Sequence, residues 1–179
     1  AQGEIAQALD SLKRAEQAWP RDRELVDSLR ARIWLRQADN DPRCLDDAIQ
    51  WAQGLDTQLD GGGDEYDAVR LALARVILAQ HRLKSASGQP DLQPLFRFLD
   101  RQLDLARGQG RLGWEVEILI LQALAWQAQG NVTQAIGSLQ CALALAEPEG
   151  YARVFVDAPI AALLRRAAPR SGYASKLLA

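Results

Sequence analysis

The residues that could carry out acid–base chemistry in this sequence are few and scattered. His81 is the only histidine, and its neighbours in the run Leu78-Ala79-Gln80-His81-Arg82 include no serine, cysteine or carboxylate at the spacing of a catalytic triad. General acid–base catalysis by histidine needs a group to act on and a partner that orients the ring. The pattern therefore favours a surface or groove histidine and predicts a protein that is not an enzyme.

Two further patterns suggest a metal or a cofactor, and neither is complete. Carboxylates cluster at 46–47, at 60–67 around Gly61-Gly62-Gly63, and at 147–149. The middle cluster lacks the residue order and terminal glutamate of a calcium loop, so a flexible turn with a helix cap explains it better. Gly108, Gly110 and Gly113 form G-x-G-x-x-G, but they follow a helical pattern where the dinucleotide fingerprint needs a strand. We expect no metal and no cofactor in this chain.

The tryptophans offer another kind of chemistry, because an indole ring can stack on a sugar or a peptide. Of the five tryptophans, Trp34 and Trp126 fall on first helices of the helix pairs that are predicted below. Polar side chains on such first helices would supply hydrogen bonds in a concave groove, where helical-repeat proteins bind their ligands. The candidate groove residues are Arg32, Trp34, Arg70, Glu117, Trp126 and Gln127. The alternative is that the tryptophans pack between neighbouring helices.

The composition is that of a globular protein and excludes several functions. The 179 residues are 48% hydrophobic and 25% charged, with a formal net charge of -2, so the chain has no basic excess to hold nucleic acid directly. It has no apolar run of about 18 residues and no signal peptide, so we expect a cytoplasmic protein without a membrane contact. Methionine is absent, which predicts a fragment of a larger protein. Cys44 and Cys141 are expected to be small buried residues.

Helix-forming residues dominate, and glycine or proline interrupts them at regular intervals. The interruptions predict an all-α protein, with an irregular stretch over 148–157. Asp22 and Asp64 are predicted to cap helices, and Gly130-Asn131 is predicted to end one. The predicted helices span 3–18, 22–38, 43–59, 65–85, 91–108, 112–129, 132–147, about 159–167, and 170 to the end.

Small and large apolar residues repeat along these helices. Ala8, Leu12 and Ala15 have the same spacing as Ala135, Leu139 and Ala142, which places each set on one face of its helix. The sharpest unit is 119–148, where a small residue, Trp126, Gly130, the second alanine set and Pro148 follow one another as in a tetratricopeptide repeat. We therefore predict a tetratricopeptide-like α-solenoid, a right-handed superhelix of antiparallel helix pairs, with an ordinary helical bundle as the alternative.

One segment is more specific than the repeat. Residues 113–168 resemble the end of the helical-repeat region in MalT-like, LuxR-type transcriptional regulators, which are large ATP-binding activators. The similarity is carried by Glu117-Ile118-Leu119, by Glu147-Pro148-Glu149-Gly150-Tyr151 and by Arg153-Val154-Phe155-Val156-Asp157, with Tyr173 to Leu178 completing it. The shortened turn at Asp157-Ala158-Pro159 departs from the family pattern. The resemblance implies one repeat domain over 1–179, with regular helix pairs to about 147 and capping helices at 148–179.

The resemblance also implies the function and the partners. The chain would be a non-catalytic, effector-sensing and interaction region, and a small-molecule inducer or a regulatory protein would occupy its groove. The ATPase and helix-turn-helix modules of the parent protein would be its other partners, because this sequence has neither a GxxxxGK[ST] phosphate loop nor a recognition helix. The fragment itself is expected not to bind nucleic acid. The alternative is an autonomous repeat scaffold that binds peptides of partner proteins.

Two surface features leave further interactions open. Helix 3–18 is predicted to be the second helix of a pair, so Ile5, Leu9 and Leu12 would form an exposed apolar stripe through which two copies could form a homodimer. The segment from residue 150 onward is basic, and it is either a solvated helix face or an aid to DNA binding by the missing module. Its basic residues are Arg153, Arg165, Arg166, Arg170 and Lys176.

Overall fold

The computed structural model describes residues 2–18, 23–55, 59, 68–83, 91–156 and 158–178. Every regular element within these ranges is a helix, and none of the described residues forms a strand. The prediction of an all-α, tetratricopeptide-like fold is therefore confirmed. The chain divides into two compact units, one containing the described residues up to 83 and the other the described residues from 91 onward. The single repeat domain over 1–179 stays a prediction.

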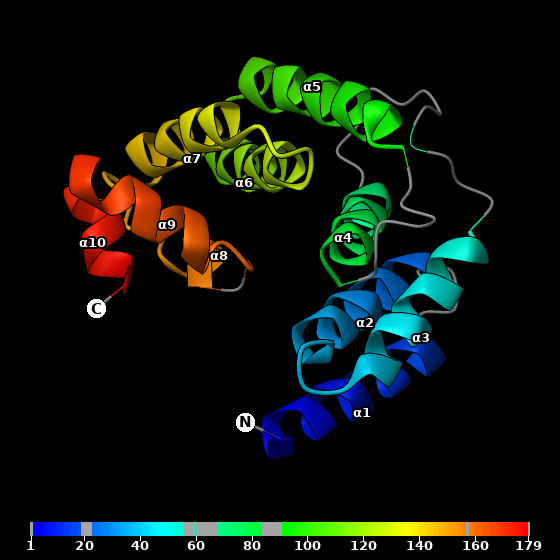
Figure 1. The fold of residues 1–179 in the computed structure, drawn as a ribbon. Helices are drawn as coiled ribbons and strands as arrows, with labels where there is room; N and C mark the ends of the chain where they lie inside the picture. Colours follow the sequence, from blue (N-terminus) through cyan, green and yellow to red (C-terminus); the bar gives the residue numbers. More distant parts are fainter. Residues whose placement is uncertain are drawn as a thin grey trace. The chain divides into compact units, whose positions relative to one another are not determined.

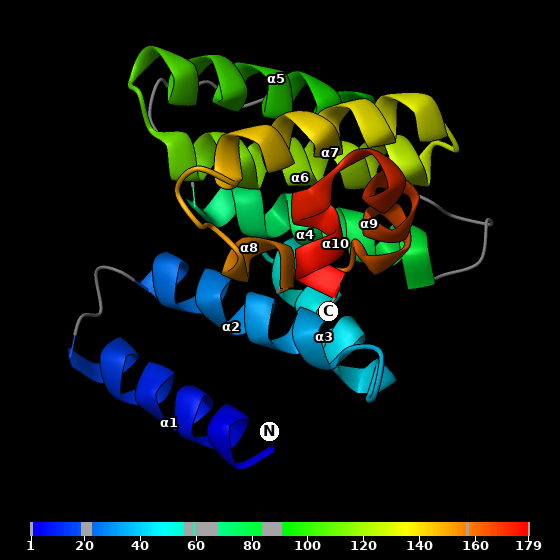
Figure 2. The ribbon, with the colours of Figure 1, turned by 90° about the vertical axis from the view of Figure 1, so that its left-hand side faces the viewer.

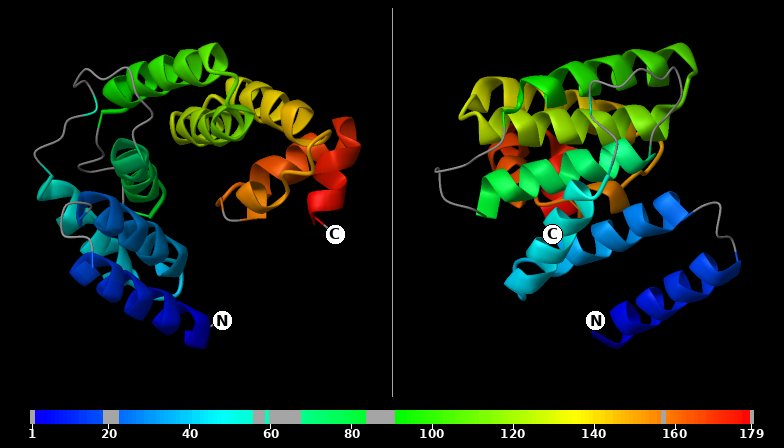
Figure 3. Two further views of the ribbon diagram at one scale, coloured as in Figure 1. Left: turned by 180° about the vertical axis from the view of Figure 1, so that it is seen from behind. Right: turned by 90° about the vertical axis from the view of Figure 1, so that its right-hand side faces the viewer.

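The described residues of the first unit form four helices, with α2 at their centre. Helices α1, α3 and α4 all pack on α2, and α3 also packs on α4. Figure 3 shows α1 lying alongside α2, and Figure 1 labels all four helices. Their bounds are α1 (Gln2–Ala18), α2 (Arg23–Gln37), α3 (Pro42–Gln53) and α4 (Ala68–Leu83).

One buried cluster of the first unit is aliphatic. It combines a residue just after α2 with residues of α3 and α4, and Trp34 and Trp51 pack against it. Ala48 of α3 has no exposed surface. The cluster consists of Ala38, Leu45, Ala48, Ile49 and Val76.

The second unit is a sequential stack. Helix α5 packs on α6, α6 on α7, α7 on α9, and α9 on α10. Figure 2 shows α5, α6 and α7 as neighbouring, nearly parallel rods. A short 3-10 helix at Ala168–Arg170 joins the last two α-helices. The bounds are α5 (Gln93–Gly108), α6 (Leu112–Ala128), α7 (Val132–Ala146), α8 (Arg153–Val156), α9 (Ala161–Ala167) and α10 (Gly172–Leu178).

The middle of helix α6 is covered on all sides. Six consecutive residues, 118–123, are buried, and six residues span more than one and a half turns of α-helix. Helices α5 and α7 both pack on α6. On α7 the burial is one-sided, as the repeat predicted, because Ala135, Leu139 and Ala142 are each 0% exposed. Alanine at two of these positions lets the α7 backbone come close to its neighbour.

The helix boundaries follow the predicted ones with three differences. Helix α3 ends at Gln53, with Gly54 as its C-terminal cap, rather than at 59. The stretch 148–157, predicted as irregular, contains the short helix α8. Gly130 has a left-handed backbone, with φ 77°, and follows the end of α6 as predicted. Asn131, however, is the N-cap of α7, and its side chain accepts a hydrogen bond from the Gln134 backbone N–H. The predicted caps Asp22 and Asp64 lie outside the described residues.

Helix α1 is joined to α2 by a network of ion pairs. Arg30 of α2 donates a hydrogen bond to Glu16 of α1 at 2.8 Å, and Arg23 lies 3.3 Å from the same carboxylate. Asp27 of α2 pairs with both arginines. Leu9 and Leu12 of α1 are half-buried, and the burial of Ile5 lies outside the described side chains. The homodimer through α1 stays a prediction.

The Glu16 contact predicts an effect of pH on the first unit. The hydrogen bond from Arg30 lowers the pKa of Glu16 against a smaller opposing effect of burial, and the positive charges of Arg30 and Arg23 lower it further. A carboxylate with a lowered pKa stabilises the fold above its unfolded-state pKa of about 4.3, and this stabilisation is lost as pH falls through the folded-state pKa. At pH 7 we expect the urea midpoint of unfolding to be higher for the wild-type protein than for Glu16→Gln. Below pH 4 we expect this difference in midpoint to shrink.

The control for this experiment is Asp10→Asn, which removes the exposed ion pair between Asp10 and Arg14 within α1. An exposed pair of this kind contributes little. A Glu16→Gln difference that stays constant from pH 7 to pH 3 would contradict the ion-pair interpretation.

Candidate groove residues and their surroundings

The six predicted groove residues fall into two sets of three. Arg32 and Trp34 of α2 and Arg70 of α4 belong to the first unit, and Glu117, Trp126 and Gln127 of α6 belong to the second. All three helices were predicted to be first helices of pairs. Within each unit the structure shows what surrounds these side chains. A single groove made by all six stays a prediction.

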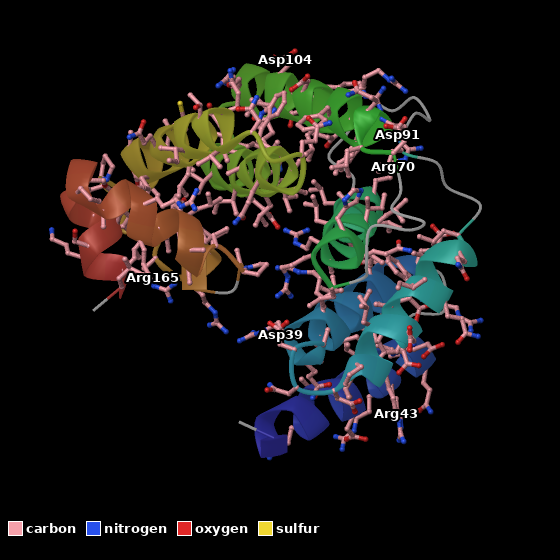
Figure 4. All side chains as sticks on the ribbon, in the orientation of Figure 1. Asp39, Arg43, Arg70, Asp91, Asp104 and Arg165 are labelled. Carbon is pink, nitrogen blue, oxygen red and sulfur yellow. The ribbon has the colours of Figure 1, made fainter. Side chains whose placement is uncertain are left out.

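In the first unit, Trp34 is a packing residue. Its ring is half-buried against the core cluster. Arg32 lies two positions earlier on α2 and is exposed, and residues two apart on a helix do not share a face. Arg70 stands in the first turn of α4 and is half-buried (Figure 4). Trp34 and Arg32 therefore do not form one stacking and hydrogen-bonding surface.

In the second unit, Trp126 joins α6 to α5. Its ring centroid lies 4.3 Å from that of Phe96, with 41° between the ring planes. Glu117 is nine residues before Trp126, or two and a half helical turns, so the two side chains leave α6 on opposite sides. Gln127 and Glu117 are both half-buried. The tryptophan contact is the interhelical packing that was the alternative to a ligand role.

A buried polar contact between α5 and α6 was not predicted. The Gln122 side-chain amide donates a hydrogen bond to Asp100 at 2.7 Å, and Gln122 is 7% exposed. The charged carboxylate of Asp100 accepts this hydrogen bond at the edge of the apolar contact between α5 and α6. It fixes the register of the two helices, because a shift of one helix along its axis would leave the Gln122 amide without its partner. The sequence signal was a single glutamine within the apolar run of α6.

The turn between α5 and α6 is also held by side chains. The glycine pattern at 108–113 is a helix-to-helix turn, as predicted: α5 ends at Gly108, and Gly110 has φ 63°, a left-handed conformation that favours glycine. Arg107 pairs with Glu115 at 2.9 Å across the turn. The Arg111 guanidinium lies 3.9 Å from the Trp114 ring centroid. Trp114 is thus engaged in a cation–π contact within the protein.

His81 and the carboxylate clusters were the other candidates for chemistry in the sequence. His81 is half-buried near the end of α4, and the described residues contain no group of three His, Cys, Asp or Glu side chains that could hold a metal ion. The glycine-rich cluster at 60–67 lies outside the described residues.

The prediction that both cysteines are buried is wrong. Cys44 is half-buried and Cys141 is exposed on α7. Cys141 directly precedes the buried Ala142, and one residue turns a helix by about 100°, which carries it off the packing face. Burial raises the pKa of the Cys44 thiol, and the nearby charges of Asp41 and Asp47 raise it further. Both effects keep Cys44 protonated and therefore weakly nucleophilic.

The basic C-terminal segment presents several charges to solvent. Arg165 and Arg166 of α9 and Lys176 of α10 are exposed, and Arg165 is labelled on α9 in Figure 4. Arg153 of α8 is exposed too. No helix in the described parts of the chain combines the length and the apolar character that crossing a membrane requires.

Comparison with known families gives one match that covers almost the whole chain. The model of the MalT-like TPR region matches residues 1–170. No curated protein and no solved structure matches the chain. The family match extends well beyond residues 113–168, which carry the resemblance in the sequence.

Proposed function

Because the chain belongs to the family of MalT-like TPR regions, we propose that it is the non-catalytic, effector-sensing and interaction region of a LuxR-type transcriptional regulator. The observation that carries this proposal is the family match over residues 1–170, together with helix packing of the tetratricopeptide kind. A regulator of this class acts where the DNA is, so the proposed location is the cytoplasm.

The packing suggests how an effector could act through such a region. In a helical repeat each helix contacts mainly its neighbours, so a ligand that changes one contact biases the next one along the stack. In the second unit α6 couples α5 to α7, and α7 couples α6 to α9. We propose that a small-molecule inducer or a regulatory protein binds at a first helix, such as α2 or α6, and that the ATPase and DNA-binding modules of the parent protein respond.

The intact gene provides the test of this assignment. We expect the coding sequence upstream of this segment to contain a phosphate loop, and the sequence downstream to contain a helix-turn-helix. A gene that encodes neither would contradict the regulator assignment, and would favour an autonomous tetratricopeptide scaffold that binds partner peptides.

A second prediction concerns this chain alone: it should bind neither ATP nor a specific DNA duplex. The chain has no GxxxxGK[ST] loop to surround phosphates with backbone N–H groups, and its net charge is -2. Calorimetric titration with Mg-ATP and a gel shift with operator DNA at about 0.2 M salt would measure both, since weak basic contacts fade with salt. Sequence-specific DNA binding under these conditions would overturn the proposed division of roles.

A further inference from the structure

A groove with a volume of about 550 Å³ runs along α2 and α3 of the first unit. Its lining includes Trp34 of α2 and Trp51 of α3, together with charged residues of both helices. Sites that bind small ligands or side chains commonly have volumes of about 300–1,000 Å³. The groove is therefore large enough for a specific occupant.

The two tryptophans form a fixed aromatic part of this groove. Both are half-buried, and both pack against the core cluster of the first unit, which holds their rings in place. An indole ring that is anchored on one side keeps its remaining surface available at little cost in side-chain entropy. The face of such a ring attracts cations.

The charges of the groove have one predominant sign. Three carboxylates, Glu24, Asp27 and Asp47, line it against a single guanidinium, Arg23. Asp27 and Arg23 already belong to the ion-pair network with α1. Glu24 and Asp47 are exposed, and neither forms an ion pair within the described part of the chain. Two carboxylates thus remain available in the groove that the two indole rings line.

The shape of the groove argues for a peptide rather than a single small cation. Glu24 and Trp34 are ten residues apart on α2, which corresponds to about 15 Å of helix. Because α2 and α3 are joined by a short turn and run antiparallel, Asp47 lies toward the Trp34 end and the available carboxylates are separated along the groove. About five residues of extended peptide span this length.

We propose that this groove binds an extended, arginine-containing peptide segment of a partner protein. The guanidinium groups would contact Glu24 and Asp47, and their apolar stems would lie on Trp34 and Trp51. Arginine suits both contacts, because its planar group bonds carboxylates and stacks on aromatic rings. An acidic peptide would meet repulsion from the same carboxylates. This inference does not depend on the proposed regulator role.

The binding experiment uses a fluorescently labelled, capped peptide of six alanines in which the first and fifth residues are replaced by arginine. Fluorescence anisotropy with the full chain should show saturable binding that weakens as salt is raised. Glu24→Gln and Asp47→Asn should each weaken binding roughly 2- to 5-fold, the range for partly solvated charge contacts. Asp104→Asn is the matched control, because Asp104 is an exposed carboxylate on α5 in the second unit (Figure 4).

Two further arms decide the identity of the occupant. The same peptide with glutamate in place of arginine should not bind, and equal binding of both peptides would overturn the proposal. Butylguanidinium should compete only weakly with the labelled arginine peptide for the groove. If butylguanidinium bound as tightly as the peptide, the assignment of the groove to a peptide would be overturned. Absence of binding by the arginine peptide at 1 mM, or the same loss of binding in Asp104→Asn as in Asp47→Asn, would also overturn it. Circular dichroism of each variant would show that the helices are retained.

Discussion

Replacing Phe98 with alanine is expected to lower the free energy of unfolding of the second unit by about 3–5 kcal/mol. Phe98 lies in the middle of α5, is 0% exposed, and is among the largest fully buried side chains of the described residues. Its loss removes a large apolar surface from the core and leaves a cavity that the surrounding helices fill only in part. Few single substitutions in this chain should have a larger effect.

Tryptophan fluorescence can report on this unit alone. Trp114 and Trp126 lie in the second unit, so urea unfolding would be followed in a background where Trp19, Trp34 and Trp51 are phenylalanine. Tyr151→Ala is the matched aromatic control, because Tyr151 belongs to the same unit and is 42% exposed. It should cost no more than about 1 kcal/mol. A Phe98→Ala effect as small as that of the control would show that α5 does not contribute this residue to the core.

Enlarging the alanines of α7 is expected to destabilise the second unit for the opposite reason. Ala135 and Ala142 are each 0% exposed on the packed face of α7, so an added leucine side chain has to displace neighbouring atoms. Overpacking of this kind costs about 1–3 kcal/mol. Ala135→Leu and Ala142→Leu should each lower the urea midpoint in the same fluorescence assay.

The same helix supplies a control. Ala144 is exposed, two residues beyond Ala142, and leucine forms helix nearly as well as alanine. Ala144→Leu should therefore leave the midpoint almost unchanged. If all three variants behaved alike, the rotation of α7 about its axis would differ from the one described, and the repeat spacing would lose its structural meaning.

The helices were predictable because their signals are local. The spacing of Ala135, Leu139 and Ala142 identifies one face of α7 without knowledge of what covers that face, and all three are fully buried. The apolar residues continue to Leu59, which predicts a longer helix, but α3 ends at Gln53 because Gly54 caps it. Asn131, predicted at the end of α6, is the N-cap of α7. The sequence does not show from which backbone N–H its side chain accepts a hydrogen bond.

The surroundings of the candidate site residues could not be predicted in the same way. The contact between Phe96 and Trp126 and the ion pair between Glu16 and Arg30 each join two helices, so both depend on how the helices cross. A repeat pattern shows that Trp126 lies on a first helix, but the direction of its ring depends on the rotation of α6. The groove with Trp34 and Trp51 likewise required the packing of α2 on α3.

The turn at Gly130 has a consequence for how the second unit folds. It joins α6 to α7 with few intervening residues, and these two helices pack on each other over their lengths. Closing so short a loop costs little chain entropy, and contacts between sequence neighbours favour fast folding. We therefore expect the α6–α7 hairpin to act as the folding nucleus, with α5 adding on one side and α9 on the other. Substitutions in this hairpin would then slow refolding, whereas equally destabilising ones in α10 would mainly accelerate unfolding.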